Sequence, residues 1–267
     1  MVCLSDDDIQ FFIDEGYLIK RNVLNSDLMA QARESLWANA PEKLDRDDPE
    51  SWIGPFETMS DDRDSVRHGF TWKYRRQGSE DWMIRLLAKD PSVWAMAEQL
   101  LGTGNLMEPE RVRGIYCILP EGEAPERPYG FHVDRHPFHL GVVAYIDDVV
   151  PNGGGFAVLP QSHRTFYYDF HTQYTMEPTD TLKKHIWQLC QKPYVDCHGQ
   201  AGDIIFWHHR LGHSAGHNRS KNIRQAVLYD YRRRDLDDLL DSSPQPDMWR
   251  DWPGVKAYLA RADEKAG

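Results

Sequence analysis

The sequence predicts a mainly β protein with flanking helices, an α+β fold whose core is a jelly roll. Residues 1–110 place apolar side chains largely at helical spacing, and from Arg111 onward the apolar period changes to two. Short apolar runs separated by glycine-rich turns are typical of jelly rolls and barrels. With 267 residues, 40% of them hydrophobic, the chain can bury a substantial core. We therefore expect one domain over 1–267, with the jelly-roll core at 111–232 and a tail at 233–267.

The first segment is expected to provide helical support and to cover a pocket. Ser5 precedes three aspartates and a helical apolar pattern that ends at Gly16. This arrangement predicts a capped helix, followed by a short strand at 17–19. Asn25 or Ser26 would cap a second helix. The chain is thus expected to begin with a helix, a strand and a helix.

The rest of the first segment is less regular. Residues 39–67 are polar and contain several prolines, so we expect a long irregular excursion that forms a lid or a pocket wall. Aromatic residues alternate over 68–76, which predicts a strand or an extended cover. Apolar residues at helical spacing over 82–101, interrupted at Pro91, predict two helices on the outside of the fold.

Later apolar runs predict the strands of the core. These strands are expected at 112–119, 131–134, 140–146, 156–159, 204–207 and 223–231. The three glycines at 153–155 mark a turn between two of them. A helix is expected at 180–189, and another at 249–259 on the surface of the tail.

Composition excludes several classes of protein. The formal net charge of −11 argues against a nucleic-acid-binding protein, whose contact surface would be basic. No apolar run approaches the ~18 residues that a membrane span needs, and the first residues lack the pattern of a signal peptide. The four cysteines form no C-x-x-C pair, which favours free thiols and a cytoplasmic location. We expect a monomer or a homodimer that binds a small molecule.

The best candidate site begins with His132 and Asp134. Residues two apart in a strand point to the same face, so this imidazole and this carboxylate would lie side by side. A firm metal site needs a third donor, for which His213 is our candidate. Two histidines and one carboxylate form the facial triad of non-haem Fe(II) oxygenases, which leaves coordination positions open. The first pair alone also fits a surface strand with a salt-bridged histidine.

A zinc site is the rival interpretation of the histidine-rich segment. His209 and His217 each lie four residues from His213, the spacing of zinc ligands on a helix. Glycines interrupt any helix here, and no glutamate completes an H-E-x-x-H motif, so we reject this site. His208, His209 and His217 are instead expected beside the site or on the surface.

Arg224 is a candidate anion-binding residue. It begins an alternating strand and shares a face with Ala226 and Leu228. An arginine among apolar neighbours must find an anion or lose solvation energy, and its planar guanidinium suits a carboxylate. The partner is either one of the 42 acidic residues or the distal carboxylate of a bound dicarboxylate that chelates the metal.

In combination these motifs resemble the phytanoyl-CoA dioxygenase family of Fe(II)/2-oxoglutarate oxygenases. The family pattern is H-x-D, a glycine-rich turn into P-x-S-H, then G-D, then H with N five residues on and R eleven residues on. The matching residues are His132 and Asp134, Gly153 to Gly155, Pro160 to His163, Gly202 and Asp203, and His213 with Asn218 and Arg224. Residues 8–17 also resemble the family's opening helix and strand. The resemblance covers nearly the whole chain and implies a cupin-like double-stranded β-helix.

The resemblance also implies a chemistry. His132, Asp134 and His213 would hold Fe(II), with 2-oxoglutarate and O2 as cosubstrates, and Arg224 would bind a carboxylate of the 2-oxoglutarate. The implied reaction is hydroxylation of a small-molecule metabolite, or its desaturation or cyclisation, with release of succinate and CO2. The alternatives are a catalytically silent jelly-roll protein that binds a ligand, and a metal-dependent hydrolase.

Two positions depart from the family pattern. Ser214 and Ala215 stand where many members have Gly and then Ser, whose hydroxyl helps the arginine to bind the cosubstrate. We therefore keep Ser214 as a candidate for that contact. Gln161 stands where Gly is usual, which we expect to be a loop variation. Asp134 fills the position that related halogenases leave small, so halogenation is not expected.

The sequence offers four candidates for the substrate pocket, Trp72, Arg75, Arg113 and Tyr116. They come from the predicted cover and from the first strand of the core. Each is also compatible with a structural role. We see no basic groove for the phosphates of an acyl-CoA, which favours a smaller metabolite.

Overall fold

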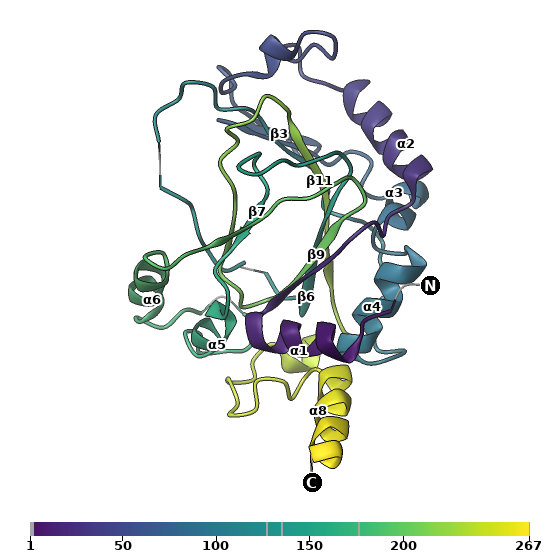
Figure 1. Ribbon diagram of the computed structural model, residues 1–267, viewed down its shortest axis with the longest axis vertical. Helices are drawn as coiled ribbons and strands as arrows, with labels where there is room; N and C mark the ends of the chain where they lie inside the picture. The colour runs from purple at the N-terminus through teal and green to yellow at the C-terminus, as the bar shows by residue number, and fades with distance from the viewer. Residues whose placement is uncertain (1–2, 127, 135, 176, 267) are drawn as a thin grey trace.

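The strands in the described part of the chain form two antiparallel sheets (Figure 1). The computed structural model describes residues 3–126, 128–134, 136–175 and 177–266. The large sheet has eight strands in the order β1-β9-β6-β11-β5-β4-β3-β2. Their bounds are β1 (Tyr17–Lys20), β2 (Ser60–Asp61), β3 (Ser65–His68), β4 (Thr71–Tyr74), β5 (Gly114–Ile118), β6 (Leu140–Tyr145), β9 (Ile204–His208) and β11 (Arg224–Tyr231).

A small sheet packs on one face of the large sheet. It has the order β10-β7-β8, with β7 (Phe156–Val158), β8 (Val195–Cys197) and β10 (His213–Ala215). Alternate residues of both sheets, among them Val143, Phe156 and Trp207, bury themselves between the two layers. We call this cluster the inner core. Two antiparallel sheets around such a core form the jelly roll that the sequence predicts.

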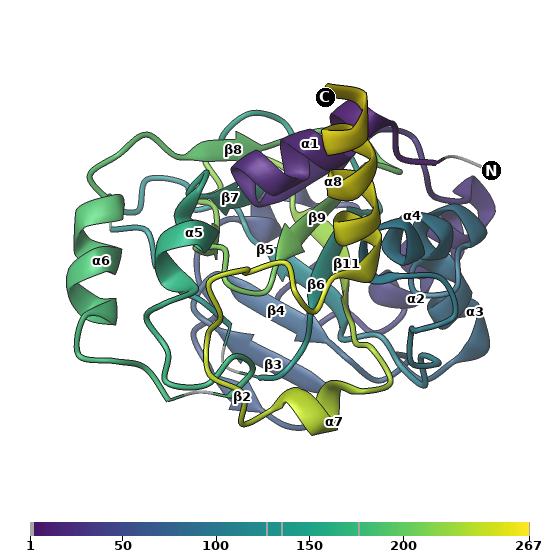
Figure 2. The same ribbon diagram turned by 90° about the horizontal axis from the view of Figure 1, so that it is seen from below.

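The other face of the large sheet packs on helices. The strand residues that point away from the inner core, such as Trp72 and Phe206, form the main hydrophobic core with helical side chains. The helices that contribute are α1 (Asp6–Glu15), α2 (Ser26–Trp37), α3 (Asp81–Leu86), α4 (Pro91–Leu101) and α8 (Pro253–Ala266). Two further helices, α5 (Ser162–Phe166) and α6 (Leu182–Leu189), lie on the opposite side of the molecule from α2 to α4 (Figures 1 and 2). The short elements η1 (Pro49–Trp52) and α7 (Leu236–Leu239) complete the set.

The first helix begins and ends where its sequence predicts. The Ser5 side chain accepts a hydrogen bond from the Asp8 amide, and the Asp8 carboxylate accepts one from the Ser5 amide, a capping box. Gly16 ends the helix with a φ of +80°, which favours glycine. A Cβ at Gly16 would also lie 2.4 Å from His163 Nδ1, so the turn packs tightly on α5.

A second glycine allows a large ring into the inner core. Gly141 in β6 lies directly opposite Trp207 in β9. A Cβ on Gly141 would lie 2.1 Å from the indole ring, so the ring covers the bare backbone. The Trp207 ring then contacts Phe156 at 5.0 Å and His213 at 5.5 Å between ring centroids. Gly141 thus helps to place the wall against which His213 packs.

Most of the predicted elements are confirmed, but the predicted division of the chain is incomplete. Residues 1–110 supply helices as expected, and they also supply β1 to β4, half of the strands of the large sheet. The period-two pattern at 68–76 is therefore a strand, β4, which pairs with β5. The excursion at 39–67 contains η1 and β2 and the first residues of β3.

Two predictions of local structure need correction. Residues 131–134 do not form a strand, because only His132 pairs, in an isolated bridge with His213. The predicted tail helix begins at Pro253 and is not a bare surface helix, since Trp252 and Val255 are fully buried against the rest of the fold. Among the described residues, no helix combines the length and the apolar character needed to cross a bilayer.

Candidate metal centre

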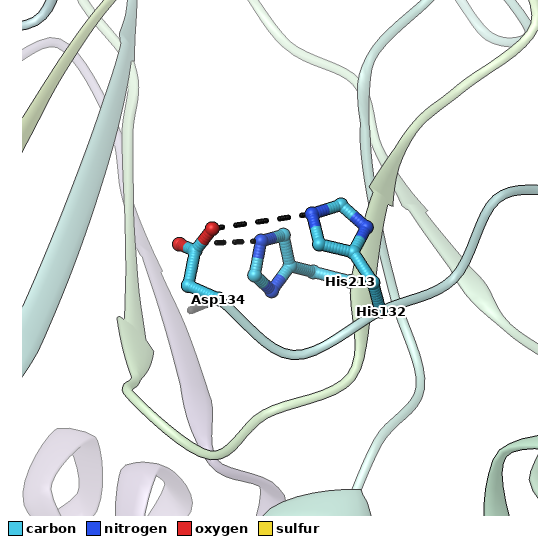
Figure 3. Close-up of side chains that lie close together, drawn as sticks. All are labelled: His132, Asp134 and His213. Atoms are coloured by element: carbon cyan, nitrogen blue, oxygen red, sulfur yellow. Dashed lines mark ion pairs between the residues drawn. The ribbon is translucent and has the colours of Figure 1, made fainter. Parts of the chain in front are cut away.

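The structure brings His132, Asp134 and His213 together (Figure 3). The backbones of the two histidines exchange hydrogen bonds, each of 3.0 Å between amide nitrogen and carbonyl oxygen. His213 Nε2 lies 3.5 Å from Asp134 Oδ2, and His132 Nε2 lies 3.9 Å from Asp134 Oδ1. One donor atom from each residue lies within 4.8 Å of the other two. Two chain segments eighty residues apart in the sequence therefore form one three-donor group.

The hydrogen bonds of the two imidazoles leave the facing nitrogens free. His132 Nδ1 lies 2.8 Å from the carbonyl oxygen of Gly130, and His213 Nδ1 lies 3.0 Å from that of Leu211. A carbonyl only accepts, so each Nδ1 carries the proton and each Nε2 keeps its lone pair. Metal-binding histidines are commonly oriented in this way, through the nitrogen that does not bind the metal.

The electrostatics of the site match the protonation that a metal needs. Burial lowers the pKa of His213 to about 4, although the Asp134 carboxylate opposes this shift, so His213 is neutral at pH 7. Burial acts to raise the pKa of Asp134, but its electrostatic interactions with His213 and Arg113 outweigh burial and hold that pKa below its ordinary value. A neutral imidazole and an ionised carboxylate can bind a cation without losing a proton.

A polar cluster supports the carboxylate from behind. Arg113 donates to Asp134 Oδ2 at 3.1 Å and makes two hydrogen bonds to Asp230, of 2.6 and 2.7 Å. His136 Nε2 lies 2.8 Å from both the guanidinium and Asp230. Arg113 and its two carboxylates thus form a continuous network that fixes the orientation of Asp134.

Arg224 is buried and points into the space between the sheets. Its Nε donates to the Gly154 carbonyl at 2.8 Å and its Nη1 to the Tyr116 carbonyl at 3.0 Å. Within the described part of the chain, no carboxylate forms an ion pair with it, so a partner acid in the protein is not found there. Burial lowers the pKa of Arg224, which shows that the guanidinium pays a desolvation cost. A bound carboxylate would remove this cost.

Comparison with known proteins gives the family. The sequence matches the phytanoyl-CoA dioxygenase (PhyH) family over residues 12–226, which include all three donors and Arg224. The chain belongs to the phytanoyl-CoA dioxygenase family. The family consists of non-haem, 2-oxoglutarate-dependent oxygenases, so the resemblance drawn from the motifs is confirmed. A search of curated proteins finds no match.

Several solved structures share the fold of this chain. The carbocyclase SnoK from nogalamycin biosynthesis, described as non-haem and α-ketoglutarate dependent, aligns with a TM-score of 0.58 at 20% identity over 92% of this chain and 95% of its own. EctD from S. alaskensis with 2-oxoglutarate and 5-hydroxyectoine aligns with a TM-score of 0.58 at 19% identity, over 87% of this chain and 77% of its own. The epimerase SnoN in complex with Fe3+, α-ketoglutarate and nogalamycin RO aligns with a TM-score of 0.56 at 22% identity, over 91% of this chain and 96% of its own. At these identities the alignments establish the fold.

The two departures from the phytanoyl-CoA dioxygenase pattern have different outcomes. Ser214 alternates with His213 in β10 and pairs with Ala157, which belongs to a separate cluster outside the inner core. Its hydroxyl donates to the Ala215 carbonyl at 3.0 Å, so the side chain expected beside the cosubstrate is instead bonded to its own strand, outside the inner core. Gln161 adopts a φ of +64°, which explains why glycine suits this position.

The four substrate-pocket candidates divide between the two faces of the large sheet. Trp72 lies in the main hydrophobic core and is 1% exposed, so it cannot line a pocket beside the donors. Tyr116 points to the opposite face, where it packs against the inner core. Arg75 lies beside Tyr116, with 3.4 Å between Nη2 and the phenol oxygen. Arg113 binds Asp134 and Asp230 and is therefore a positioning residue.

Sequence reasoning missed three residues near the donors. Lys73 pairs with Tyr116 across β4 and β5, and its ammonium lies 5.1 Å from the centre of that ring. Lys73 lies between Trp72 and Tyr74, whose side chains face the main hydrophobic core. Because neighbouring residues of a strand point to opposite faces, Lys73 points to the face that carries the inner core and the metal donors, which we call the donor face. Asp230 is the second of these residues. It lies in the same strand as Arg224 and an even number of residues away, so both side chains point to the same face. His136 is the third, and it lies two residues after Asp134.

The other histidines of the segment are buried. We expected His208 and His209 beside the site or on the surface. They are 0% and 3% exposed, so the second of these alternatives is wrong for them. His208 stacks on Trp252 at 5.0 Å between ring centroids. His217 is half-buried, and its Nδ1 lies 2.8 Å from Glu121. In the described ranges, none of the three joins a group that could hold a metal.

A pocket lies beside the supporting cluster. It has a volume of about 470 Å³, and Arg113, His136 and Asp230 form the part of its lining nearest to Asp134. Its remaining lining is mixed in charge, with Glu108, Glu110, Arg111 and Arg232 among other residues. Arg113 thus lines this pocket and also binds Asp134 of the donor group.

Proposed function

We propose that this chain is an Fe(II)- and 2-oxoglutarate-dependent oxygenase that oxidises a small molecule and uses His132, Asp134 and His213 as the iron ligands. The observation that carries this proposal is the pair of free Nε2 atoms facing one ionised carboxylate. Two imidazoles and one carboxylate are the donor set of non-haem Fe(II) oxygenases. The fit is chemical as well as geometric, because neither His213 nor Asp134 must lose a proton to bind a cation.

Each side chain of the site has a separate role in this proposal. His132, Asp134 and His213 would hold the ion through two imidazoles and one carboxylate. Arg224 would bind a carboxylate of 2-oxoglutarate. Bound Fe(II) and 2-oxoglutarate supply the oxidising power, with O2 consumed and succinate and CO2 released. Arg113 keeps Asp134 ionised and oriented.

Hydroxylation is the outcome that we propose by default, with desaturation or cyclisation on the same centre as the variants. The solved relatives include a carbocyclase and an epimerase, so the fold supports outcomes other than hydroxylation. We further propose a cytoplasmic monomer or homodimer organised as one domain. Four free cysteines and a net charge of −11 support this location and speak against nucleic acid as a partner.

Turnover of 2-oxoglutarate tests the proposal. The purified chain with Fe(II), ascorbate and a metabolite panel is expected to consume O2 and form succinate, and Asp134→Ala should lose at least about 100-fold of this rate because a metal ligand is missing. The matched control is Asp196→Ala, an acid of β8 outside the donor group. Equal succinate formation by Asp134→Ala would contradict the ligand role.

A second variant tests the binding of the cosubstrate. Arg224→Met is expected to bind Mn(II) like the unchanged chain but to require about 10–100 times more 2-oxoglutarate for half-saturation, because a charge-assisted pair is lost. Isothermal titration measures both affinities. Hydrolysis without O2 consumption would instead indicate a metal-dependent hydrolase. Ligand binding without any turnover would indicate a silent protein.

A further inference from the structure

Two cations, Lys73 and Arg75, lie on the donor face beside the ring of Tyr116. Lys73 Nζ lies 5.1 Å and Arg75 Cζ lies 5.8 Å from the centre of the Tyr116 ring. Arg75 also reaches the phenol oxygen, at 3.4 Å. Within the described ranges neither cation forms an ion pair with a carboxylate. Two positive charges thus lie at the ring of Tyr116 without a direct ion-pair partner in the described part of the chain.

These cations belong to the same face as the donor group. Tyr116 pairs with Ala226 of the inner core, and His213 packs on that core through Phe156, at 5.2 Å between ring centroids. Lys73 interacts with the charge of Asp134, and burial together with the charges of Arg75 and Arg113 lowers the pKa of Lys73. The mutual repulsion is a cost that an anion would relieve.

The acids nearby do not supply that anion. Asp134 is occupied by Arg113 and by its proposed role as a ligand. Asp61 stands on the same face as Lys73, two strands away in the sheet, and is exposed. The two carboxylates of 2-oxoglutarate are assigned, one to the metal and one to Arg224. A further anion is therefore needed, and the substrate is the component that remains.

We propose that the substrate carries an oxyanion, a carboxylate or a phosphate ester, which binds Arg75 beside Lys73 over the ring of Tyr116. This inference rests on the proposed function and names the substrate class of that site. A guanidinium offers two parallel N–H donors to such a group, and the neighbouring ammonium adds a point charge. Binding the acid group here would hold the rest of the substrate near the open positions of the metal.

Inorganic phosphate is a direct probe of the site. The full chain is loaded with Mn(II) and saturating 2-oxoglutarate, and phosphate is titrated while its ³¹P line width is recorded. Phosphate bound near the paramagnetic ion should broaden saturably. Arg75→Gln should weaken this binding by about tenfold or more, because a charge-assisted contact is removed. Arg75→Lys, which retains the charge, should restore part of it.

The neighbouring arginine provides a matched control. Arg76 is exposed and lies 3.8 Å from Asp64, so Arg76→Gln removes the same charge without touching the proposed site and should leave phosphate binding unchanged. Equal broadening in Arg75→Gln and the unchanged chain would overturn the inference. So would a loss of 2-oxoglutarate affinity in Arg75→Gln in place of a loss of phosphate affinity, because Arg75 would then serve the cosubstrate.

The outcomes separate this inference from the proposed function. If 2-oxoglutarate does not bind to the Mn(II)-loaded chain, the proposed function fails and this inference fails with it. If 2-oxoglutarate binds but phosphate does not, only this inference is wrong. In a metabolite panel that pairs each acid with its methyl ester, we expect the acids alone to stimulate succinate formation. Stimulation by the esters to the same extent would contradict the proposal.

Discussion

At the scale of single residues, one oxygen atom of Asp134 has two neighbours. Its Oδ2 lies 3.1 Å from Arg113 Nη2 and 3.5 Å from His213 Nε2, whereas Oδ1 faces His132. Arg113 therefore limits how the carboxylate can turn toward a bound ion. Arg113 also neutralises Asp230, which is only 8% exposed. Without the guanidinium, the buried carboxylates of Asp134 and Asp230 would lie close together without a shared cation.

Removal of the guanidinium should therefore destabilise the fold. Arg113→Met leaves Asp134 and Asp230 without their shared cation, and loss of one partner of a buried ion pair costs about 3–5 kcal/mol. Urea denaturation of the metal-free protein measures this loss in the free energy of unfolding. Arg111→Met, at an exposed position two residues away, is the control and should change it by less than about 0.5 kcal/mol. A loss below 1 kcal/mol in Arg113→Met would show that the network contributes little.

At the scale of elements, the pairing of β6 with β9 determines the wall behind His213. The strand pair places a glycine opposite a tryptophan, and the indole fills the space that a side chain on Gly141 would need. The ring is fully buried and touches both Phe156 and His213. A displaced ring would therefore displace the imidazole that packs on it.

A single methyl group tests this packing. Gly141→Ala should lower the free energy of unfolding by roughly 1–3 kcal/mol or more, because the indole must move in a close-packed core. It should also weaken Mn(II) binding through the displaced His213. Gly130→Ala is the control, since its added Cβ would meet only Ser214 Oγ at 3.9 Å. Calorimetry reports both quantities, and an unchanged metal affinity in Gly141→Ala would mean that the wall does not position His213.

The sequence predicted those elements whose own pattern is strong. The capped helix at Ser5 and the alternating strand that contains Arg224 need only local information. The strands β8 and β10 have three residues each, too few for any period to be detected. The face of Ser214 and the core position of Trp72 depend on strand pairing, which a local pattern does not contain. The group of His132, Asp134 and His213 could be predicted because the motif pattern of the family links residues that are far apart in the sequence and close in the fold.

At the scale of the whole molecule, a cluster of buried histidines lies where the sheets meet the helices. His139, His163, His208 and His209 are all within 3% of complete burial, beside Trp252 next to α8. Burial lowers the pKa of His139 to about 3 and that of His163 to about 4, and it lowers those of His208 and His209 as well. The fold therefore holds them in the neutral form.

Acid should destabilise the protein through this cluster. Above pH 6.5 both the folded and the unfolded chains keep these imidazoles neutral, and stability is at its full value. As the pH falls from 6.5 toward 4, the unfolded chain binds protons that the folded chain does not, so the free energy of unfolding falls. His163 alone is expected to account for about 3 kcal/mol once the pH is below 4, because burial lowers its pKa from 6.5 to about 4.

Chemical denaturation of the metal-free protein at a series of pH values measures this loss. His163→Gln should reduce the slope of stability against pH in this range, whereas His198→Gln, at a half-exposed side chain, should not. The same slope in His163→Gln as in the unchanged chain would show that this imidazole does not contribute to the acid sensitivity.

The two imidazoles of the donor group differ in their access to water, since the side chain of His132 is 54% exposed and that of His213 only 6%. In the proposed centre, a departing ion would be released first on the solvent side and last by the enclosed ring. His132 would then govern how quickly the ion exchanges with chelators. The buried His213 and Asp134 would govern how tightly the ion is retained. Iron supply and iron retention would thus be set by different residues of one small cluster.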